Sequence, residues 1–465
     1  MMHGEPSAGA TPSISGPTIS GPSWVQHAIW WHVYPLGFTG AEQAREARAP
    51  VRHRLRHLHS WLDYALELGV SGLALGPIFA SETHGYDTTD HFRIDPRLGD
   101  DGDFDALVDA AGRRGVRIML DGVFNHVARS HPAFRRVLDE GPGADTASWF
   151  RLRWPPDASA RRPGTEPDYD DFEGHHHLVA LDHSSPAVVD HVAAVMNHWL
   201  DRGAAAWRLD AAYAVPTQFW AQVADRVRAR HPDAYLMGEM IHGDYAAFVR
   251  DGHLDAVTQY ELWKAVWSSL NDHNFHELAH ALGRHDEFLA HFVPYTFLGN
   301  HDVTRIASRL DDQRHLAHAL AVLATVGGTP AVYAGDEQAY RGIKEDRAGG
   351  DDAVRPPFPP TPADMSPVGA PVLARHQELL GLRRRHPWLH HARTRVLTVA
   401  DEHIALASTA DGDRIVTVLS TADHRQTVAA AGVRDVLAGT GRIDHPGGDN
   451  AQVTVEAHSW AVLSG

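Results

Sequence analysis

Short apolar runs alternate with longer segments of helical apolar spacing from residue 25 onward. Residues 29–34 and 72–75 are apolar runs of strand length, and residues 51–68 between them carry apolar side chains at helical intervals and stop at Gly69. The alternation occurs eight times, which predicts parallel strands joined by helices in right-handed crossovers. Because eight such units close into a ring, we expect an α/β fold of the (β/α)8 TIM-barrel type. The remaining expected strands are 116–120, one ending at Asp210, one ending at Glu239, 256–259, 295–298 and 331–333, and the remaining expected helices are 104–115, about 186–201 after an N-cap at Ser184-Ser185, one after Pro216, and 371–385.

Two segments interrupt the alternation, and the pattern changes near the C-terminus. Residues 128–185 are too long and too polar for a strand–helix loop, so they predict an inserted domain after the third strand that forms one wall of the site. Residues 335–371 are dense in charge and proline, which indicates an ordered loop over the barrel mouth. In residues 388–465 apolar side chains recur at every second position, which predicts a C-terminal antiparallel β-sandwich. The barrel then comprises residues 25–127 and 186–387.

Composition and charge exclude several classes of partner. The 465 residues carry a formal net charge of −17, so no basic stripe is available for nucleic acid or an anionic membrane. No apolar run of about 18 residues predicts a membrane span, and the absence of cysteine excludes disulfides and thiol catalysis. Residues 1–24 lack the basic and apolar regions of a signal peptide and predict a disordered tail. We therefore expect a cytoplasmic protein that is a monomer or a weak homo-oligomer.

Carboxylates follow the predicted strands where those strands end. Asp210, Glu239 and Asp302 each stand shortly after a separate apolar run. In a barrel the carboxyl ends of the strands meet on one face, so we expect the three acids to converge above the barrel axis. Carboxylates that flank one bond are what the cleavage of a glycoside needs. The sequence therefore predicts glycoside chemistry.

The neighbours of two of these acids suggest different roles. Arg208 and Asp210 are i and i+2 on a strand and share a face, where the guanidinium is expected to lower the pKa of Asp210 and keep it ionised as a nucleophile. Glu239 lies between Met237 and Met240, a less polar setting that suits it to protonate a leaving oxygen. Carboxyl groups about 5–5.5 Å apart give double displacement with retention, whereas a wider gap gives inversion.

The segments that carry these acids occur in the order of the sequence regions of the α-amylase family, glycoside hydrolase family 13, and resemble them. The matching segments are 121–126 (DGVFNH), 207–210 (WRLD), 238–239 (GE) and 299–302 (GNHD), with supporting matches at 69–78, 84–90 and 328–337. The resemblance covers residues 25–465. It implies a retaining α-glycosidase that hydrolyses mainly α-1,4 bonds in short gluco-oligosaccharides.

The resemblance also implies a role for each site residue. Asp210 would be the nucleophile, Glu239 the general acid/base, and Asp302 the stabiliser of the transition state that grips sugar hydroxyls. The residues implied to line the subsite of the reacting glucose are Tyr86, Asp87, His126, Arg208 and His301, with Tyr86 as the stacking platform. Asn125 matches a calcium-ligand position, so calcium is a possible ligand, although no cofactor is required.

The chain departs from the family in three places. Ile241 stands two residues after Glu239, where maltodextrin-acting relatives often carry an aromatic residue. Residues 178–182 match the fifth family region only loosely. The run His175–His177 suggests a metal, but neighbours on an extended chain point to opposite faces, so we interpret it as polar loop or substrate-wall residues.

Three alternative functions differ in what they require of the sequence. A transglycosidase or isomerase on the same scaffold, converting sucrose or trehalose, would differ in how well the inserted wall and the mouth loop exclude water. A non-catalytic amylase-like binding protein would have lost acids, and all three are present. A doubly wound nucleotide enzyme needs a glycine-rich loop after its first strand, where this chain has residues 34–38, YPLGF.

The two walls of the predicted cleft contain bulky aromatic residues. They are Trp149, Phe150, Trp154, Tyr169, Phe172 and Phe358. About half of them are expected in the core of the insertion, and the others would narrow the cleft to a pocket of few subsites. We therefore expect action on short, soluble oligosaccharides and not on raw starch.

Overall fold

The computed structural model describes residues 21–46, 49–157, 162–347 and 349–465. Most of the predicted N-terminal tail lies outside these residues, but its last four belong to the folded protein. The 3-10 helix η1 (Ser23–His27) places the indole of Trp24 edge-on against Trp30 and Tyr235. The prediction of a disordered tail was therefore wrong for residues 21–24, because Trp24 covers the end of the barrel where these strands begin.

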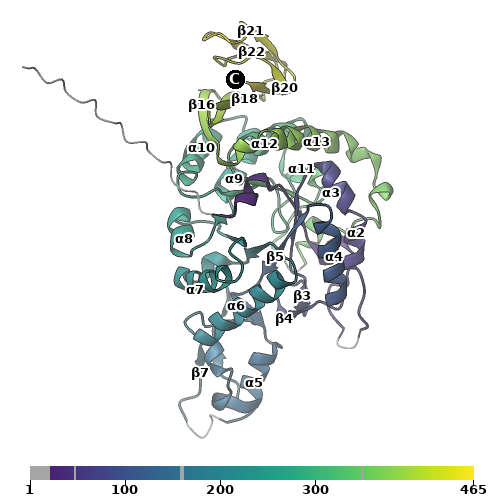
Figure 1. The fold of residues 1–465 in the computed structure, drawn as a ribbon, viewed down its shortest axis with the longest axis vertical. Helices are drawn as coiled ribbons and strands as arrows, with labels where there is room; N and C mark the ends of the chain where they lie inside the picture. The colour runs from purple at the N-terminus through teal and green to yellow at the C-terminus, as the bar shows by residue number, and fades with distance from the viewer. Residues whose placement is uncertain (1–20, 47–48, 158–161, 348) are drawn as a thin grey trace, which may run out of the picture.

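Eight parallel strands form the centre of the molecule (Figure 1). They are β1 (Trp30–Val33), β2 (Gly72–Leu75), β5 (Arg117–Gly122), β11 (Ala206–Leu209), β12 (Tyr235–Gly238), β13 (Ala256–Val257), β14 (Tyr295–Phe297) and β15 (Thr329–Tyr333). Their order is β13-β12-β11-β5-β2-β1-β15-β14, and a parallel bridge between Thr258 and Tyr295 joins the two outer strands. The predicted TIM barrel is confirmed. The sixth strand is shorter than the predicted 256–259, because the side chain of Gln259 caps the next helix.

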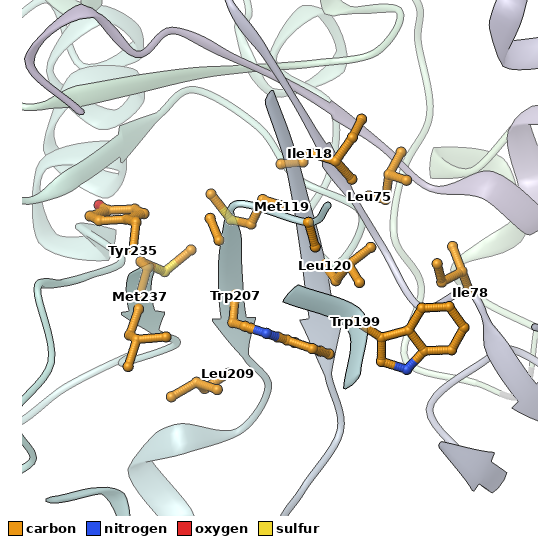
Figure 2. Close-up of a cluster of buried hydrophobic side chains, with 14 of the residues drawn as sticks. Leu75, Ile78, Ile118, Met119, Leu120, Trp199, Trp207, Leu209, Tyr235 and Met237 are labelled. Atoms are coloured by element: carbon orange, nitrogen blue, oxygen red, sulfur yellow. The ribbon is translucent and has the colours of Figure 1, made fainter. Parts of the chain in front are cut away.

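The barrel strands are buried on both faces. Figure 2 shows side chains of β5, β11 and β12 gathered with Trp199 from a covering helix. Trp199 and Trp207 are fully buried, and Met119 on β5 and Met237 on β12 are almost completely so. Because helices cover the outside of a parallel barrel, successive residues of a strand are apolar, and this explains the unbroken apolar runs of the sequence.

The covering helices follow the predicted alternation. They are α1 (Pro35–Phe38), α2 (Leu55–His59), α3 (Leu62–Leu68), α4 (Asp101–Gly112), α6 (Pro186–Asp201), α7 (Thr217–Arg228), α8 (Tyr245–Asp251), α9 (Tyr260–Asn271), α10 (His276–Phe288), α11 (Ile306–Arg309), α12 (Leu316–Thr325) and α13 (Ala370–Arg385), and a hairpin of β3 (Phe79–Ser81) and β4 (Thr88–Ile94) precedes α4. The single helix predicted over 51–68 is two helices, because Trp61 breaks the run and turns inward to stack on Trp31 at 6.0 Å. Pro186 occupies the first turn of α6 as predicted, but the Ser185 hydroxyl makes no capping bond within the described residues. None of the described helices is long and apolar enough to cross a bilayer.

The inserted domain follows β5 and lies at the end of the molecule opposite the C-terminal domain (Figure 1). It contains β6 (His126–Ala128), α5 (Pro132–Glu140), β7 (Leu152–Arg153), β8 (Asp168–Tyr169), β9 (Asp171–Phe172) and β10 (His175–Ala180), with sheet order β6-β10-β9. Phe134 packs edge-on against Phe150 and Tyr169 to form its core. Phe150 and Tyr169, two of the predicted wall aromatics, are thus core residues of the insertion. Phe358 of the mouth loop is also a core residue, but it packs on the barrel, where it stacks on Phe38 at 4.3 Å.

The C-terminal residues form two antiparallel sheets. One contains β16 (Arg393–Val399), β17 (His403–Ala410), β18 (Asp413–Ser420), β23 (Trp460–Ser464) and β20 (Val436–Gly439), and the other β19 (Gln426–Ala429), β22 (Gln452–Val455) and β21 (Arg442–Asp444). Val416 and Val418 of the first sheet belong to one buried cluster with Val453 and Val455 of the second. The predicted antiparallel β domain is confirmed, and it packs on α10 and α12 of the barrel.

Candidate active site

The strand register places the polar residues at one end of the barrel. Arg208 on β11 is the direct sheet partner of Asp121 on β5. The hydrogen-bond ladder continues past the strands, since the N–H of Asp210 donates to Gly122 at 3.0 Å and the N–H of Glu239 donates to Leu209 at 2.9 Å. Asp210 and Glu239 are therefore held by the sheet itself, on neighbouring positions.

Arg208 lies at the centre of the acids. Its Nη1 is 2.7 Å from both oxygens of Asp121 and 3.3 Å from Asp210, and its Nη2 is 2.8 Å from Glu239. The other oxygen of Glu239 accepts the N–H of Ala211 at 3.0 Å. Ala211 has a left-handed φ of 44°, a conformation that residues other than glycine seldom adopt. This turn directs the amide of Ala211 toward Glu239. Three buried carboxylates thus share the charge of Arg208.

Asp302 is held by two basic side chains from different segments. His301 Nε2 lies 2.9 Å from one of its oxygens, and Arg355 Nη2 donates to the other at 2.8 Å. Arg355 belongs to the loop predicted over the barrel mouth, and its Nε also donates to the carbonyl of His301 at 3.0 Å. The guanidinium lies over the ring of Tyr34, 4.7 Å from its centroid. The mouth loop therefore reaches the acids.

The predicted sugar-subsite residues are brought together, with Asp87 as the exception. The Tyr86 hydroxyl donates to Asp121 at 3.1 Å and bonds to His301, whose ring lies parallel to that of Tyr86. His126 Nε2 bonds to the carbonyl of Tyr86 at 2.9 Å. Both oxygens of Asp87 instead accept bonds from the backbone and hydroxyl of Thr83, at 3.0 and 2.5 Å. Asp87 shapes the turn that carries Tyr86.

The pKa shift of Asp210 differs from the one predicted from the sequence. Burial raises the pKa of Asp210 well above its ordinary value, and Arg208 only partly opposes this because Glu239 and Asp121 compete for its charge. Arg208 does lower the pKa of Asp210, as predicted, but burial and the neighbouring carboxylates outweigh it, so the prediction that Arg208 keeps Asp210 ionised was wrong. Burial also acts to raise the pKa of Asp302, but His301 and the nearby guanidinium groups outweigh it and hold that pKa well below its usual range. Asp302 is ionised.

Tyr260 and Arg355 complete the site and were missed by the sequence analysis. The Tyr260 hydroxyl lies 3.4 Å from Glu239 and accepts a bond from Asn300 at 2.8 Å. Tyr260 comes two residues after Thr258, whose bridge to Tyr295 joins the outer strands of the barrel. Its position just after a predicted strand could have marked it as a candidate site residue. Arg355 lies in a long loop without periodicity, and nothing in the pattern distinguished it from other charged loop residues.

The wall contributed by the inserted domain meets the barrel near these residues. Phe172 stacks on His126 at 4.6 Å, which places this wall aromatic against one of the residues predicted to line the subsite. Tyr213 comes shortly after β11, and its hydroxyl donates to Glu173 of the insertion at 3.1 Å. These contacts tie the insertion to the edge of the site.

The surroundings of Asn125 fit a calcium ion poorly. The Asn125 amide donates to His126 Nδ1 at 3.2 Å. Two of the carboxylates that line the adjoining hollow face one guanidinium group, since Arg153 Nε lies 2.7 Å from Asp168 and Arg153 Nη1 bonds to Asp170. Calcium prefers six to eight oxygen ligands, and the guanidinium group of Arg153 beside Asp168 and Asp170 opposes a cation there. The donors among the described residues do not make such a shell.

Acids on three strand ends of a (β/α)8 barrel, with an inserted wall after the third strand, define a glycoside hydrolase. The chain belongs to the α-amylase family, since the family model for the alpha amylase catalytic domain matches residues 33–395. The family resemblance seen in the sequence is confirmed.

Individual relatives are moderately similar. A cyclomaltodextrinase of Bacillus sp is 29% identical over 429 residues, covering 86% of this chain and 73% of the relative. An intracellular maltogenic amylase of Bacillus subtilis (strain 168) is 29% identical over 346 residues, but the chain spans only 58% of its length. The crystal structure of the debranching enzyme from Nostoc punctiforme superposes with a TM-score of 0.79 at 25% identity, covering 96% of this chain and 100% of that one.

Proposed function

We propose that this enzyme hydrolyses mainly α-1,4-glucosidic bonds in short gluco-oligosaccharides by double displacement with retention. The observation that carries the proposal is the convergence of Asp210 and Glu239 on Arg208, with an ionised Asp302 beside them. The cyclomaltodextrinase and maltogenic amylase relatives support a maltodextrin substrate.

In the first step an oxygen of Asp210 forms a bond to the anomeric carbon while the bond to the leaving oxygen breaks. Glu239 donates its proton to that oxygen, so the released sugar leaves neutral. In the second step Glu239 takes a proton from water, the water oxygen binds the anomeric carbon, and the ester to Asp210 breaks. Both acids return to their starting states, and the two successive inversions at the anomeric carbon give net retention.

The cluster supplies the proton that this cycle needs. Asp121, Asp210 and Glu239 surround one guanidinium in a buried setting, which disfavours full ionisation of all three. The raised pKa of Asp210 reflects that excess of negative charge. Protons in such a group belong to the cluster and not to one acid. We infer that, once the sugar is bound, one proton of the cluster lies on Glu239 and Asp210 is ionised and able to attack.

Asp302 would bind hydroxyls of the reacting glucose. It stays ionised beside His301 and Arg355, so its oxygens accept hydrogen bonds from a sugar. Charge-assisted bonds of this kind strengthen as positive charge develops at the anomeric carbon. Tyr86, whose ring is held by bonds to Asp121 and His301, would supply the apolar face on which the sugar lies.

The mouth loop supports a preference for short substrates. Arg355 bonds to Asp302 at the site and to Asp351 within its own loop, which holds this loop beside the acids. A long polymer needs an open groove on both sides of the cleaved bond, which such a loop restricts. An intracellular relative supports a cytoplasmic place for this chain, where short imported sugars are the available substrate.

The test combines product stereochemistry with chain length. NMR during hydrolysis of maltotriose should show the α-anomer of the new reducing end first, and kcat/KM should vary little from maltotriose to maltoheptaose and be low for starch. Asp210→Asn should abolish turnover, whereas the matched change Asp413→Asn, at an exposed position on β18, should not. A β-anomer first would contradict retention, a steady rise with length would contradict the restricted mouth, and new disaccharides in place of glucose release would favour transglycosylation.

A further inference from the structure

Histidines from two domains meet where the barrel contacts the C-terminal domain, which lies at the upper end of the molecule in Figure 1. His315 ends the 3-10 helix η6 (Gln313–His315) just before α12, and His458 lies in the turn before β23. His315 Nε2 is 2.9 Å from His458 Nδ1. An oxygen of Asp312 lies 4.0 Å from the same His458 nitrogen. One ligand atom from each residue lies within 4.8 Å of the others.

The ring of His458 is oriented by a carboxylate on its other side. His458 Nε2 lies 2.7 Å from Asp423 Oδ1. A carboxylate at this nitrogen keeps the proton there, so the lone pair of Nδ1 points toward His315 and Asp312. Histidines that ligate metals in proteins are oriented in this way by a second carboxylate.

The backbone also holds His458 toward this point. Its φ is 49°, in the left-handed region that residues other than glycine seldom adopt. Its N–H donates to the carbonyl of Ala422 at 3.0 Å, which fixes the turn. The side chains of His315 and His458 are buried, so both imidazoles are held at the interface.

We propose that Asp312, His315 and His458 bind a divalent transition-metal ion of the zinc type that joins the barrel to the C-terminal domain. Two imidazole nitrogens and a carboxylate oxygen are ligands that zinc accepts, with water in the fourth position. Ligand atoms of a tetrahedral zinc site lie roughly 3.4 Å apart, given bonds of about 2.0–2.1 Å. The 2.9 and 4.0 Å separations lie on either side of that value, so small side-chain shifts suffice.

The neighbouring Arg314 weakens the affinity of this site for a metal ion. Arg314 donates to both oxygens of Asp312, at 2.9 and 2.6 Å to Oδ2, which lowers the attraction for a cation. Asp312 Oδ1 also accepts the backbone N–H of Arg314 at 2.8 Å, so a metal ion has to displace a bond from the Arg314 side chain, which is 60% exposed and can turn toward solvent.

Isothermal titration of the chelator-treated full chain with zinc sulfate tests the proposal. One zinc per chain should bind, and Zn²⁺ but not Mg²⁺ should raise the Tm. His458→Gln should abolish this site. Asp423→Asn should weaken it about 10–100-fold, because Asp423 only orients the ligand.

The chain has 35 histidines, so a matched control is needed to separate this site from weak binding elsewhere. His391→Gln serves, since His391 pairs with Asp411 at 2.9 Å as His458 pairs with Asp423, yet it belongs to no metal-ligand group among the described residues. If His458→Gln does not fold, Asp312→Asn changes an accessible ligand and should weaken binding. Equal zinc binding by wild type and by His458→Gln, or a wild type without one-site binding, would show instead that Asp423, His458 and His315 form only a hydrogen-bonded chain between the domains.

Discussion

Replacement of Arg208 by lysine tests the central claim that one guanidinium organises the acids. Arginine reaches Asp121, Asp210 and Glu239 at once because its two terminal nitrogens are fixed in a plane. Lysine has a single ammonium. Since residue 208 lies directly beside Asp121 in the sheet register, we expect the lysine to pair with Asp121 and to lose the other two acids.

The magnitude follows from the bonds that are lost. A hydrogen bond to a charged group contributes about 1.5–3 kcal/mol. Loss of the bonds to Asp210 and Glu239 therefore removes about 3–6 kcal/mol of the interaction free energy that holds these two acids in place. If these bonds are needed in the transition state, kcat/KM falls by a factor of about 10²–10⁴. The acid limb of the pH profile should also move to higher pH, because Asp210 loses the cation that opposes the effect of burial on its pKa.

The assay is kcat/KM on maltotriose across pH 5–8, with thermal unfolding followed by circular dichroism. Arg383→Lys is the control, since Arg383 is also buried but donates to backbone carbonyls, among them Val326 at 2.8 Å and Gly328 at 2.6 Å. That variant should lose stability while its folded fraction keeps the wild-type kcat/KM. An Arg208→Lys enzyme within threefold of wild type on maltotriose would refute the reasoning.

Three further predictions concern the acid, the mouth and a buried glutamate. Glu239→Gln should lower kcat on maltotriose by about 10²–10⁴ and recover on α-glucosyl fluoride, whose leaving group needs no proton; an equal loss on both substrates would contradict its role as the acid. Arg355→Ala removes the side chain that ties the mouth loop to Asp302, so the ratio of kcat/KM for maltoheptaose to that for maltotriose should rise, and an unchanged ratio would show that Arg355 does not limit access. Burial raises the pKa of Glu337 to about 7, so the folded state binds more protons than the unfolded state between the two pKa values, and stability should fall by about 3 kcal/mol as pH rises from about 4.5 to 7. Glu337→Gln should flatten that slope in unfolding at pH 5, 6 and 7, and a slope equal to wild type would contradict it.

Much of the fold was predictable because a parallel strand that is buried on both faces is apolar at most positions. All eight barrel strands were recognised from such runs, and the change to alternating residues marked the C-terminal sheets. The errors arose where one side chain decided the local structure. Trp61 splits a helix by packing on Trp31, and Gln259 ends a strand by capping the next helix. Sequence periodicity averages over several residues and cannot show such single contacts.

The sequence alone indicated that Asp210, Glu239 and Asp302 meet, because residues that end parallel strands of a barrel lie on the same face. It did not indicate that Asp121 shares Arg208 with two of them. It did not determine the charge of those acids. The raised pKa of Asp210 depends on how many carboxylates share Arg208, and the lowered pKa of Asp302 depends on Arg355, which comes from a distant loop. Electrostatic energies change over distances of a few ångströms between residues far apart in the chain, so only the tertiary structure decides them.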